Sequence, residues 1–355
     1  MRLVSLYSGA GGLDLGFAKA GFIPVFSADI NRDAVDTYRT ISKVVQGEWK
    51  NAAVLFENCD VRCGDVLAES KDLSAGDAEI VIGGPPCQGF SVGGKMDPED
   101  PRIREVFHFL DVVKRVRPLV FVMENVEALA TNVKWNHIRE KMEQEVSGFY
   151  HTNIHVLNAA DYGVPQLRRR MFFVGMIGAD ASYAQRLQEM VMIPVASGDA
   201  LRKLPKFGQV GNNDCGNAQI VPAKNPILRK SPYSGMLFNG HGRVINLSEP
   251  APTIVASLGG NRTPIVDEKA LRDGAEPWIL QYHGEVQNYP HKRYEQMLAD
   301  SPLRRITVEE AACLQSFPDD LKFAGYRSSR YSQIGNAVPP MLAYALANAI
   351  MADLK

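Results

Sequence analysis

The stretch at residues 83–91, which reads Gly-Gly-Pro-Pro-Cys-Gln-Gly-Phe-Ser, constrains the fold more than any other part of this chain. It follows a largely apolar run at 78–82 that predicts a short buried strand. The prolines fix the backbone φ angle and remove amide donors, whereas the glycines permit tight turns and close approach of a ligand. We therefore expect Cys87 on a stiff loop at the carboxyl end of a strand, the edge at which open α/β sheets bind ligands. This placement favours a nucleophilic cysteine over the alternative, a small buried cysteine in a turn.

Strands and helices alternate along the first 175 residues, and this rhythm predicts an α/β fold. The fold class that we predict is a Rossmann-like, mostly parallel sheet with helices on both faces. The expected strands lie at 3–7, 23–28, 79–82, 119–123, 154–157 and 171–176, and the expected helices at 13–20, 33–42 and 104–116.

The character of the sequence changes after about residue 200. Proline, glycine and asparagine become frequent there, and helical periodicity fades until Thr307 and Glu310, which match a capping box at the start of a helix. We therefore predict a catalytic domain formed by 1–204 and 301–355, and a smaller, irregular or β-rich domain at 205–300.

The charge of the chain is nearly balanced but unevenly distributed. The chain has 355 residues and a net charge of −1. This net charge does not by itself indicate a nucleic-acid-binding protein. Residues 201–245, however, hold seven basic side chains and one acidic one. Such a patch can follow a phosphate backbone, although taken alone a solvated lysine-rich loop is the simpler explanation.

The number of cysteines and the hydropathy pattern indicate the cellular compartment of the protein. The five cysteines are too few and too scattered for a disulfide framework, so we predict a reducing cytoplasm. Cys59 and Cys63 lack a second pair of ligands, and no metal site is expected. The chain shows no run of about 18 apolar residues and no signal-peptide pattern, so we expect no membrane association.

A glycine-rich turn follows the first expected strand and opens a helix, at residues 7–12. Its backbone amides could approach a ligand closely, but the third glycine of a dinucleotide-binding motif is displaced to Gly16, which disfavours NAD. Asp29 ends the second strand, where an acid would bind ribose hydroxyls, and Asp65 is suited to the exocyclic amine of adenine. These residues indicate either a nucleoside cofactor or a purely structural turn.

The chain resembles the cytosine carbon-5 DNA methyltransferases, and the resemblance runs from end to end. Six motifs of that family occur here in the family's order, which is far more specific than any single tetrapeptide. They are Tyr-Ser-Gly-Ala-Gly-Gly at 7–12, the Pro-Cys loop at 83–91, Glu-Asn-Val at 124–126, Gln-x-Arg-x-Arg at 166–170, the ninth motif at 305–318 and the last motif at 333–340.

The resemblance implies S-adenosylmethionine as methyl donor and double-stranded DNA as substrate, held between a catalytic domain and a target-recognition domain. It implies a DNA cytosine-5-methyltransferase of the prokaryotic restriction-modification type, acting as a monomer and open to functional pairing with a restriction endonuclease. The residues that would line its cofactor pocket are Tyr7, Ser8, Gly9, Gly11, Gly12, Asp29, Asp65, Val66, Pro86, Asn336 and Val338.

The chemistry of this reaction accounts for four further residues. Carbon 5 of cytosine is a poor nucleophile until a thiolate adds to carbon 6, and Cys87 would supply that thiolate. Negative charge then develops on the ring, and Glu124 would hold or donate a proton at ring nitrogen 3, which requires a raised pKa. Arg168 and Arg170 would point from one strand face into the same pocket and stabilise the adduct, with Gln166 ordering the loop. The structural alternatives are that Glu124 is a helix-start residue and that the arginine run forms a solvated basic edge strand.

The target cytosine is inaccessible in a duplex, so it would be flipped into the pocket. Residues 88–101 are expected to form a mobile lid over it. Thr253 would contact the DNA backbone, and Arg262 lies in a candidate base-reading loop, although a β-hairpin turn explains that segment equally well. The predicted DNA contacts are Gln88, Ser91, Thr253 and Arg262.

Two other interpretations are weaker. The related tRNA methyltransferases carry a Cys-Phe-Thr element, which this sequence lacks. A catalytically dead DNA-binding relative should have lost Cys87, Glu124 or the glycine turn, and all are present.

The family's leucine in the fifth motif has no clear counterpart after Asp100-Pro101-Arg102, so that position stays unassigned.

Overall fold

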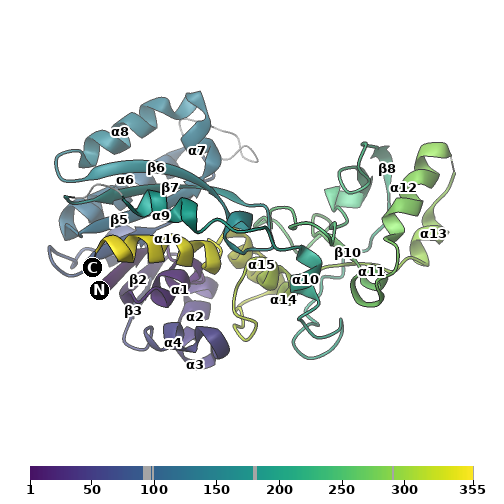
Figure 1. Cartoon of the computed structure of the whole chain (residues 1–355), viewed down its shortest axis with the longest axis horizontal. Helices are drawn as coiled ribbons and strands as arrows, with labels where there is room; N and C mark the ends of the chain where they lie inside the picture. The colour runs from purple at the N-terminus through teal and green to yellow at the C-terminus, as the bar shows by residue number, and fades with distance from the viewer. Residues whose placement is uncertain (91–96, 98–99, 179–181, 290–291, 355) are drawn as a thin grey trace.

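The computed structural model describes residues 1–90, 97, 100–178, 182–289 and 292–354. The molecule is elongated, with a larger lobe built around a sheet at one end and a smaller lobe at the other (Figure 1). Both termini lie in the larger lobe. Of the predicted site residues, Ser91 lies outside the described residues, as does most of the predicted lid.

The larger lobe contains a seven-stranded sheet in the order β3-β2-β1-β4-β5-β7-β6. Strands β1 to β5 pair in parallel, whereas β7 is antiparallel to both β5 and β6. This confirms the mostly parallel sheet, with β3 as a strand that the sequence pattern did not predict. The strands are β1 (Arg2–Leu6), β2 (Ile23–Asp29), β3 (Asp60–Cys63), β4 (Ile80–Gly83), β5 (Val120–Val126), β6 (His151–Asn158) and β7 (Arg169–Met176).

Helices cover both faces of this sheet, so alternate residues of a strand enter different hydrophobic layers. In β4, Ile80 and Ile82 pack with residues of α16, whereas Val81 packs with residues of α6. The helices of this lobe are α1 (Gly12–Lys19), α2 (Arg32–Tyr38), α3 (Ile41–Val44), α4 (Lys50–Val54), α5 (Val66–Glu69), α6 (Arg104–Val116), α7 (Glu127–Thr131), α8 (Asn136–Val146), α9 (Ser182–Glu189) and α16 (Pro340–Asp353).

The smaller lobe combines two short antiparallel sheets with helices. Its helices were not predicted, although the buried residues of α12, Ile279, Tyr282 and Val286, follow helical spacing. In the folded chain Trp278 and Phe238 stack on Tyr282 at 4.9 and 5.3 Å. The elements are β8 (Pro222–Ile227), β9 (Met236–Phe238), β10 (Ile265–Asp267), β11 (Leu303–Arg305), α11 (Glu268–Asp273), α12 (Trp278–Asn288) and α13 (Glu295–Ala299).

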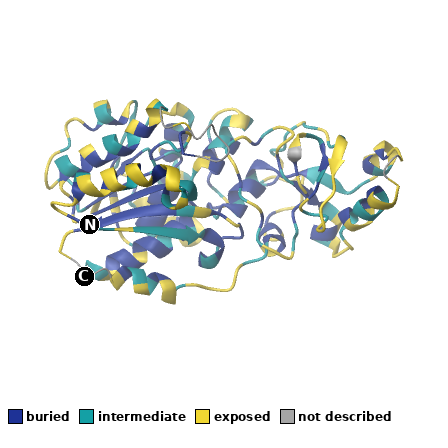
Figure 2. Ribbon diagram, turned by 90° about the horizontal axis from the view of Figure 1, so that it is seen from above, coloured by how far each residue is buried: buried dark blue, intermediate teal, exposed yellow. Residues whose placement is uncertain are grey.

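Three helices lie where the two lobes meet: α10 (Ser197–Leu201), α14 (Val308–Leu314) and α15 (Arg327–Asn336). The stretch Arg327–Asp353 is long and apolar enough to cross a membrane by composition, but 72% of its most apolar window is buried inside the fold. Buried residues run from the sheet into this junction (Figure 2). One core cluster contains Tyr38 of the larger lobe together with Ile254 and Leu271. The hydrophobic core therefore continues across the predicted domain boundaries at 204 and 301, and these boundaries stay a prediction.

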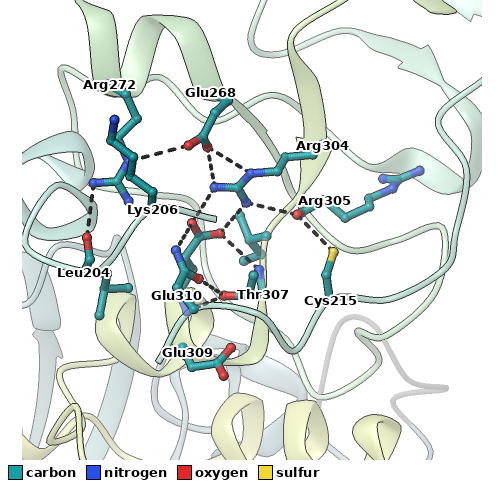
Figure 3. Close-up of polar contacts among 12 residues, drawn as sticks. Leu204, Lys206, Cys215, Glu268, Arg272, Arg304, Arg305, Thr307, Glu309 and Glu310 are labelled. Atoms are coloured by element: carbon teal, nitrogen blue, oxygen red, sulfur yellow. Dashed lines mark hydrogen bonds and ion pairs between the residues drawn. The ribbon is translucent and has the colours of Figure 1, made fainter. Parts of the chain in front are cut away.

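A polar cluster of Glu268, Arg304, Thr307 and Glu310, here called the Arg304 cluster, ties α11, β11 and α14 together (Figure 3). Arg304 donates to Glu268 Oε2 at 2.6 Å and to Glu310 Oε1 at 2.6 Å. The fully buried Glu310 also accepts from the Thr307 amide at 3.0 Å, and the Glu310 amide donates to Thr307 Oγ1. These bonds confirm the predicted capping box.

Candidate active site

A cavity of about 460 Å³ lies where β1, β2, β4 and β5 end. From β1 the chain adds β2 and β3 toward one edge of the sheet and then β4 and β5 on the other side of β1, so the strand order switches between β1 and β4. Open α/β sheets bind ligands at such a switch point. The cavity brings together most of the residues singled out in the sequence, whereas Gly11, Thr253 and Arg262 do not line it. The predicted residues in its lining are Tyr7, Ser8, Gly9, Gly12, Asp29, Asp65, Val66, Pro86, Cys87, Gln88, Glu124, Arg168, Arg170, Asn336 and Val338.

The glycine-rich turn after β1 forms one wall. Tyr7 has a φ of 55°, a left-handed conformation that is strained for a residue with a side chain and occurs mostly at functional sites. The Gly9 amide donates to Asp29 Oδ2 at 2.8 Å, and the Asn31 amide donates to Asp29 Oδ1 at 2.7 Å. Burial raises the pKa of the Asp29 carboxyl, although these two amides oppose the effect. The ends of β1 and β2 are thus held together by one carboxylate.

Two glycines of the turn are required by close packing. Gly11 has a φ of 81°, and a Cβ there would stand 2.8 Å from Ile41 Cδ1. A Cβ on Gly12 would collide with the carbonyl of Val338, so the first and last motifs touch at this point. Gly11 therefore shapes the turn from outside the cavity, and Gly12 lets Asn336 and Val338 close its other side.

The Pro-Cys loop is fastened to β5 by Asn125. This buried side chain donates from Nδ2 to the Pro85 carbonyl at 3.1 Å and accepts from the Val126 amide at 2.9 Å. A Cβ on Gly84 would lie 3.2 Å from Glu124 Oε2, which shows how near the loop passes to this carboxyl. The role of Asn125 was not predicted from the motif. The signal was present, since a polar amide in an otherwise apolar strand needs a hydrogen-bond partner.

Burial sets the protonation of the two central groups. Burial raises the pKa of the Glu124 carboxyl, and Arg170, whose Nε stands 3.1 Å from Glu124 Oε1, opposes it without reversing it. Burial also raises the pKa of the Cys87 thiol, with a further increase from Glu124, while Arg170 and Arg168 lower it. Both groups therefore hold their protons to higher pH than the free side chains do.

The two arginines of the Gln-x-Arg-x-Arg motif have different surroundings. Arg168 precedes β7 and is 1% exposed, and it donates to the carbonyls of Ile254 at 3.0 Å and Gly335 at 2.9 Å. Its Nε has no hydrogen-bond partner among the described residues, and burial lowers the pKa of its guanidinium. Both arginines line the cavity, as expected, but they do not alternate along one strand face, because β7 begins only at Arg169. Arg169 points outward and pairs with Glu127 at 2.8 Å.

Among the described residues predicted to contact DNA, Gln88 lines the cavity and Thr253 and Arg262 do not. Gln88 is exposed at its rim. Thr253 donates from Oγ1 to the Leu167 carbonyl at 2.6 Å, which fastens the segment 251–254 beside the arginine motif. Arg262 is exposed in a tight turn closed by Thr263, whose Oγ1 accepts from the Gly259 amide at 3.0 Å. All seven basic side chains of 201–245 are exposed.

One end of the cavity holds Glu105, a residue with no predicted role. Glu105, in the first turn of α6, lines the cavity and accepts from the Tyr7 hydroxyl at 2.8 Å. It follows Asp100-Pro101-Arg102, at the part of the fifth motif where the family's leucine was not clear. The motif alone could not reveal it, because an acid in place of an apolar residue gives no family signal.

The fold and the site define an α/β enzyme with a nucleoside-type cavity next to a cysteine, an acid and two arginines. Comparison with known proteins then supplies the family: the C-5 cytosine-specific DNA methylase family matches residues 1–352, and the chain belongs to it. It is thus a DNA cytosine-5-methyltransferase, and family membership implies S-adenosylmethionine as methyl donor.

Relatives match along nearly the whole chain. The Type II methyltransferase M1.HphI of Haemophilus parahaemolyticus is 33% identical, covering 99% of this chain and 87% of its own. The Type II methyltransferase M.MthTI of Methanothermobacter thermautotrophicus is 31% identical, covering 100% and 98%. The structure of the Entamoeba histolytica methyltransferase EhMeth is similar in fold, with a TM-score of 0.65 at 16% identity, covering 100% of this chain and 99% of that one.

Proposed function

We propose that this protein flips a target cytosine out of duplex DNA and methylates its carbon 5 within one specific short sequence. The observation that carries the proposal is the gathering of Cys87, Glu124 and Arg170 in the same cavity as the glycine turn and Asp29. We further propose that 1–204 with 301–355 form the catalytic domain and that 205–300 recognises the target.

The residues of the cavity fit S-adenosylmethionine. The turn at Gly9 and Gly12 leaves backbone space, Asp29 offers a carboxylate at the end of β2, and Asp65 offers another at the end of the β3 loop. We propose that Asp29 binds the ribose hydroxyls and Asp65 the adenine amine, with Tyr7, Pro86, Asn336 and Val338 packing around them. When bound, this cofactor supplies an electrophilic methyl group.

The protein's own residues would prepare the cytosine. The Cys87 thiolate adds its electron pair to carbon 6, and the charge that develops on the ring is neutralised when Glu124 donates its proton to nitrogen 3. Carbon 5 thereby becomes nucleophilic enough to accept the methyl group. Loss of the carbon-5 proton, departure of the Cys87 thiolate and return of the nitrogen-3 proton to the Glu124 carboxylate then restore the aromatic ring and the acid. The raised pKa of Glu124 suits this role, since an ordinary carboxyl would be ionised at neutral pH.

The arginines would stabilise the anionic ring. Arg170 already contacts Glu124 at the cavity wall, and its remaining donors are suited to the cytosine carbonyl. A base inside a stacked duplex cannot reach Cys87, which lies half-buried behind the rim formed by Gln88, so the base has to be extruded.

We also propose that the enzyme is a modification methyltransferase of the Type II kind, acting as a monomer and paired in function with a restriction endonuclease. This proposal is supported by relatives that are named Type II methyltransferases and match from end to end.

The test is methyl transfer from S-adenosylmethionine to unmethylated plasmid DNA, followed by bisulfite sequencing, with tRNA as a parallel substrate. Methylation confined to one short DNA sequence is expected and would identify the target. Transfer to tRNA instead, or to neither nucleic acid, would overturn the proposal.

A further inference from the structure

Arg305 is a buried arginine that extends from β11 to two segments of the smaller lobe, here called segment A (residues 239–243) and segment B (residues 259–263). We propose that Arg305 is a positioning residue for target recognition, which holds the two segments together as one surface that reads the base pairs near the flipped cytosine. The inference rests on the proposed function, since it needs duplex DNA as the substrate.

The direction of Arg305 follows from its place in β11. Neighbouring residues of a strand point to opposite faces, so Arg304 and Arg305 reach different surroundings. The side chain of Arg304 enters the Arg304 cluster, whereas the guanidinium of Arg305 points away from it (Figure 3). This separates the arginine that braces β11 and its neighbouring helices from the arginine that reaches segments A and B.

Arg305 carries a charge that no carboxylate balances. Its side chain is 2% exposed, and no ion pair joins it to an acid in the part of the chain that the structure describes. Burial lowers the pKa of its guanidinium to about 10, so the group stays charged at neutral pH. An uncharged residue would fill this place at lower cost, because burying a charge without a counter-charge is unfavourable. The position of Arg305 therefore calls for an explanation beyond stability.

The guanidinium bonds one group of each segment. Its Nη1 donates to the Thr263 carbonyl of segment B at 2.7 Å, and its Nη2 donates to Asn239 Oδ1 of segment A at 3.1 Å. Because the guanidinium is planar, the angle between these donors is fixed. Arg305 therefore sets the spacing between the two segments.

Segments A and B also pack directly against each other. Gly240 has a φ of 68°, and a Cβ there would collide with Asn261 of segment B. A Cβ on Gly242 would collide with the guanidinium of Arg305. The two segments thus form one continuous surface with the Arg305 guanidinium against it.

The outward side chains of this surface are of the kinds that recognise base edges. Arg243 of segment A and Asn261 and Arg262 of segment B are exposed. In the major groove arginine donates to O6 and N7 of guanine, and asparagine bonds N6 and N7 of adenine. The unbalanced charge of Arg305 adds positive potential to this surface, which favours the acceptor-rich edge of guanine. We therefore expect the target sequence to contain guanine.

Segment B lies within reach of the base pairs that flank the target. The Ile254 carbonyl accepts from Arg168, which lines the cavity, and Asn261 follows Ile254 by seven residues. Seven residues span at most about 25 Å, which corresponds to about seven base-pair steps of a duplex. The surface therefore faces the neighbourhood of the target cytosine and not a distant part of the DNA.

The test measures sequence discrimination, which a purely structural arginine would not change. Plasmid DNA would be methylated to the same overall extent by wild type and by each variant. Bisulfite sequencing would then count methylation at near-target sites, which differ from the target by one base pair. In Arg305→Met we expect methylation of near-target sites to rise by at least about tenfold. The Kd of S-adenosylhomocysteine should stay within about threefold of wild type, since the cofactor cavity is a separate site.

Arg305→Lys separates the charge from the positioning. Lysine keeps the positive charge but lacks the rigid pair of donors, so it cannot hold both segments at the spacing that the guanidinium sets. The salt dependence of duplex binding should remain as in wild type, whereas methylation of near-target sites should rise as in Arg305→Met. Full discrimination in the lysine variant would show that only the charge matters and would overturn the positioning role.

The matched control is Arg272→Met. Arg272 is also largely buried, and its Nε likewise has no partner among the described residues. It donates to backbone carbonyls within 202–205 rather than to segment A or B. We expect this variant to lower the Tm and to keep the discrimination of wild type. If Arg272→Met and Arg305→Met relaxed discrimination equally, general loss of stability would explain both and the proposal would be wrong.

The exposed side chains test the same surface without disturbing the core. Arg243→Gln and Arg262→Gln should each relax discrimination at one guanine of the target, by about 5- to 150-fold. Unchanged discrimination in both variants would overturn the proposal. The two proposals can fail separately. An enzyme that methylates one DNA sequence, and stays equally selective as Arg305→Met, removes only this inference, whereas an enzyme that does not methylate DNA removes the proposed function.

Discussion

The active-site cavity and the Arg304 cluster both bury charged groups, but they satisfy them to different degrees. Arg304 meets two carboxylates, and although burial lowers its pKa, the bonds and charges of Glu310 and Glu268 outweigh burial and leave that pKa raised. Arg168 meets only carbonyl oxygens, and burial lowers its pKa. The hydrogen-bonding groups of the Arg304 cluster are paired with one another and fix its geometry, whereas the cavity keeps an unpaired donor on Arg168 and an acid whose pKa burial raises.

The largest effect should come from the group that forms the covalent bond. Cys87→Ser should reduce methyl transfer by at least about 10³-fold, because an alcohol is a far weaker nucleophile than a thiolate. Filter-based transfer assays would measure this, and DNA affinity measured by gel shift should stay within about threefold of wild type. A serine variant that still methylates at the normal rate would remove Cys87 as the nucleophile.

Glu124→Gln should lower kcat by about 10²- to 10⁴-fold, since the amide cannot donate a proton to nitrogen 3. The Kd for S-adenosylhomocysteine should change little. Glu127→Gln is the matched control, because Glu127 pairs with Arg169 at the surface and should leave kcat unchanged. Equal rates for Glu124→Gln and wild type would contradict the acid role.

The Arg304 cluster should respond in stability rather than in catalysis. Arg304→Met leaves the buried Glu310 without its cation, and we expect the free energy of unfolding to fall by about 3–5 kcal/mol. Urea denaturation would measure this loss. Cofactor affinity at low temperature should be preserved, and a selective loss of cofactor binding with normal stability would show that the two regions are not separate.

The pH dependence of Cys87 alkylation tests the electrostatics of the active-site cavity. Because burial raises the pKa of the thiol and Arg170 lowers it, Arg170→Gln should shift the pH profile of Cys87 alkylation to higher pH. Iodoacetamide labelling followed by mass spectrometry at Cys87 would measure the profile. The surface variant Arg169→Gln should leave it in place, and a shift of the same size in both would contradict the assignment.

The smallest effect concerns the exposed basic segment. Changing Lys224, Arg229 and Lys230 to Gln should make the plot of log affinity against log salt shallower, by about 0.9 for each DNA phosphate that the variant no longer neutralises. Fluorescence anisotropy over a salt series would measure the slope. The same number of changes at the exposed lysines Lys43, Lys50 and Lys71 of the larger lobe should not alter it, and an unchanged slope in both would remove the segment from the DNA interface.

Local patterns in the chain predicted much of this molecule. A buried strand followed by two prolines and a cysteine led to Cys87 at a sheet edge, and the glycine turn led to the wall that faces Asp29. Both predictions rest on neighbours in the chain, which set backbone φ angles and strand ends. Helix α12 was not predicted although Ile279, Tyr282 and Val286 follow helical spacing, whereas the stacking of Phe238 on Tyr282 is a contact that only the fold creates.

What the sequence determined by itself is the order of its motifs, the mostly parallel sheet and the kinds of groups available for chemistry. Only the tertiary structure decided which of those groups have partners. Arg168 finds its acceptors at Ile254 and Gly335, 86 and 167 positions away, and Tyr7 finds Glu105 98 positions away. Such partners are backbone carbonyls or single acids that any residue pattern could contain, so their roles exist only after the chain has folded and excluded water from around them.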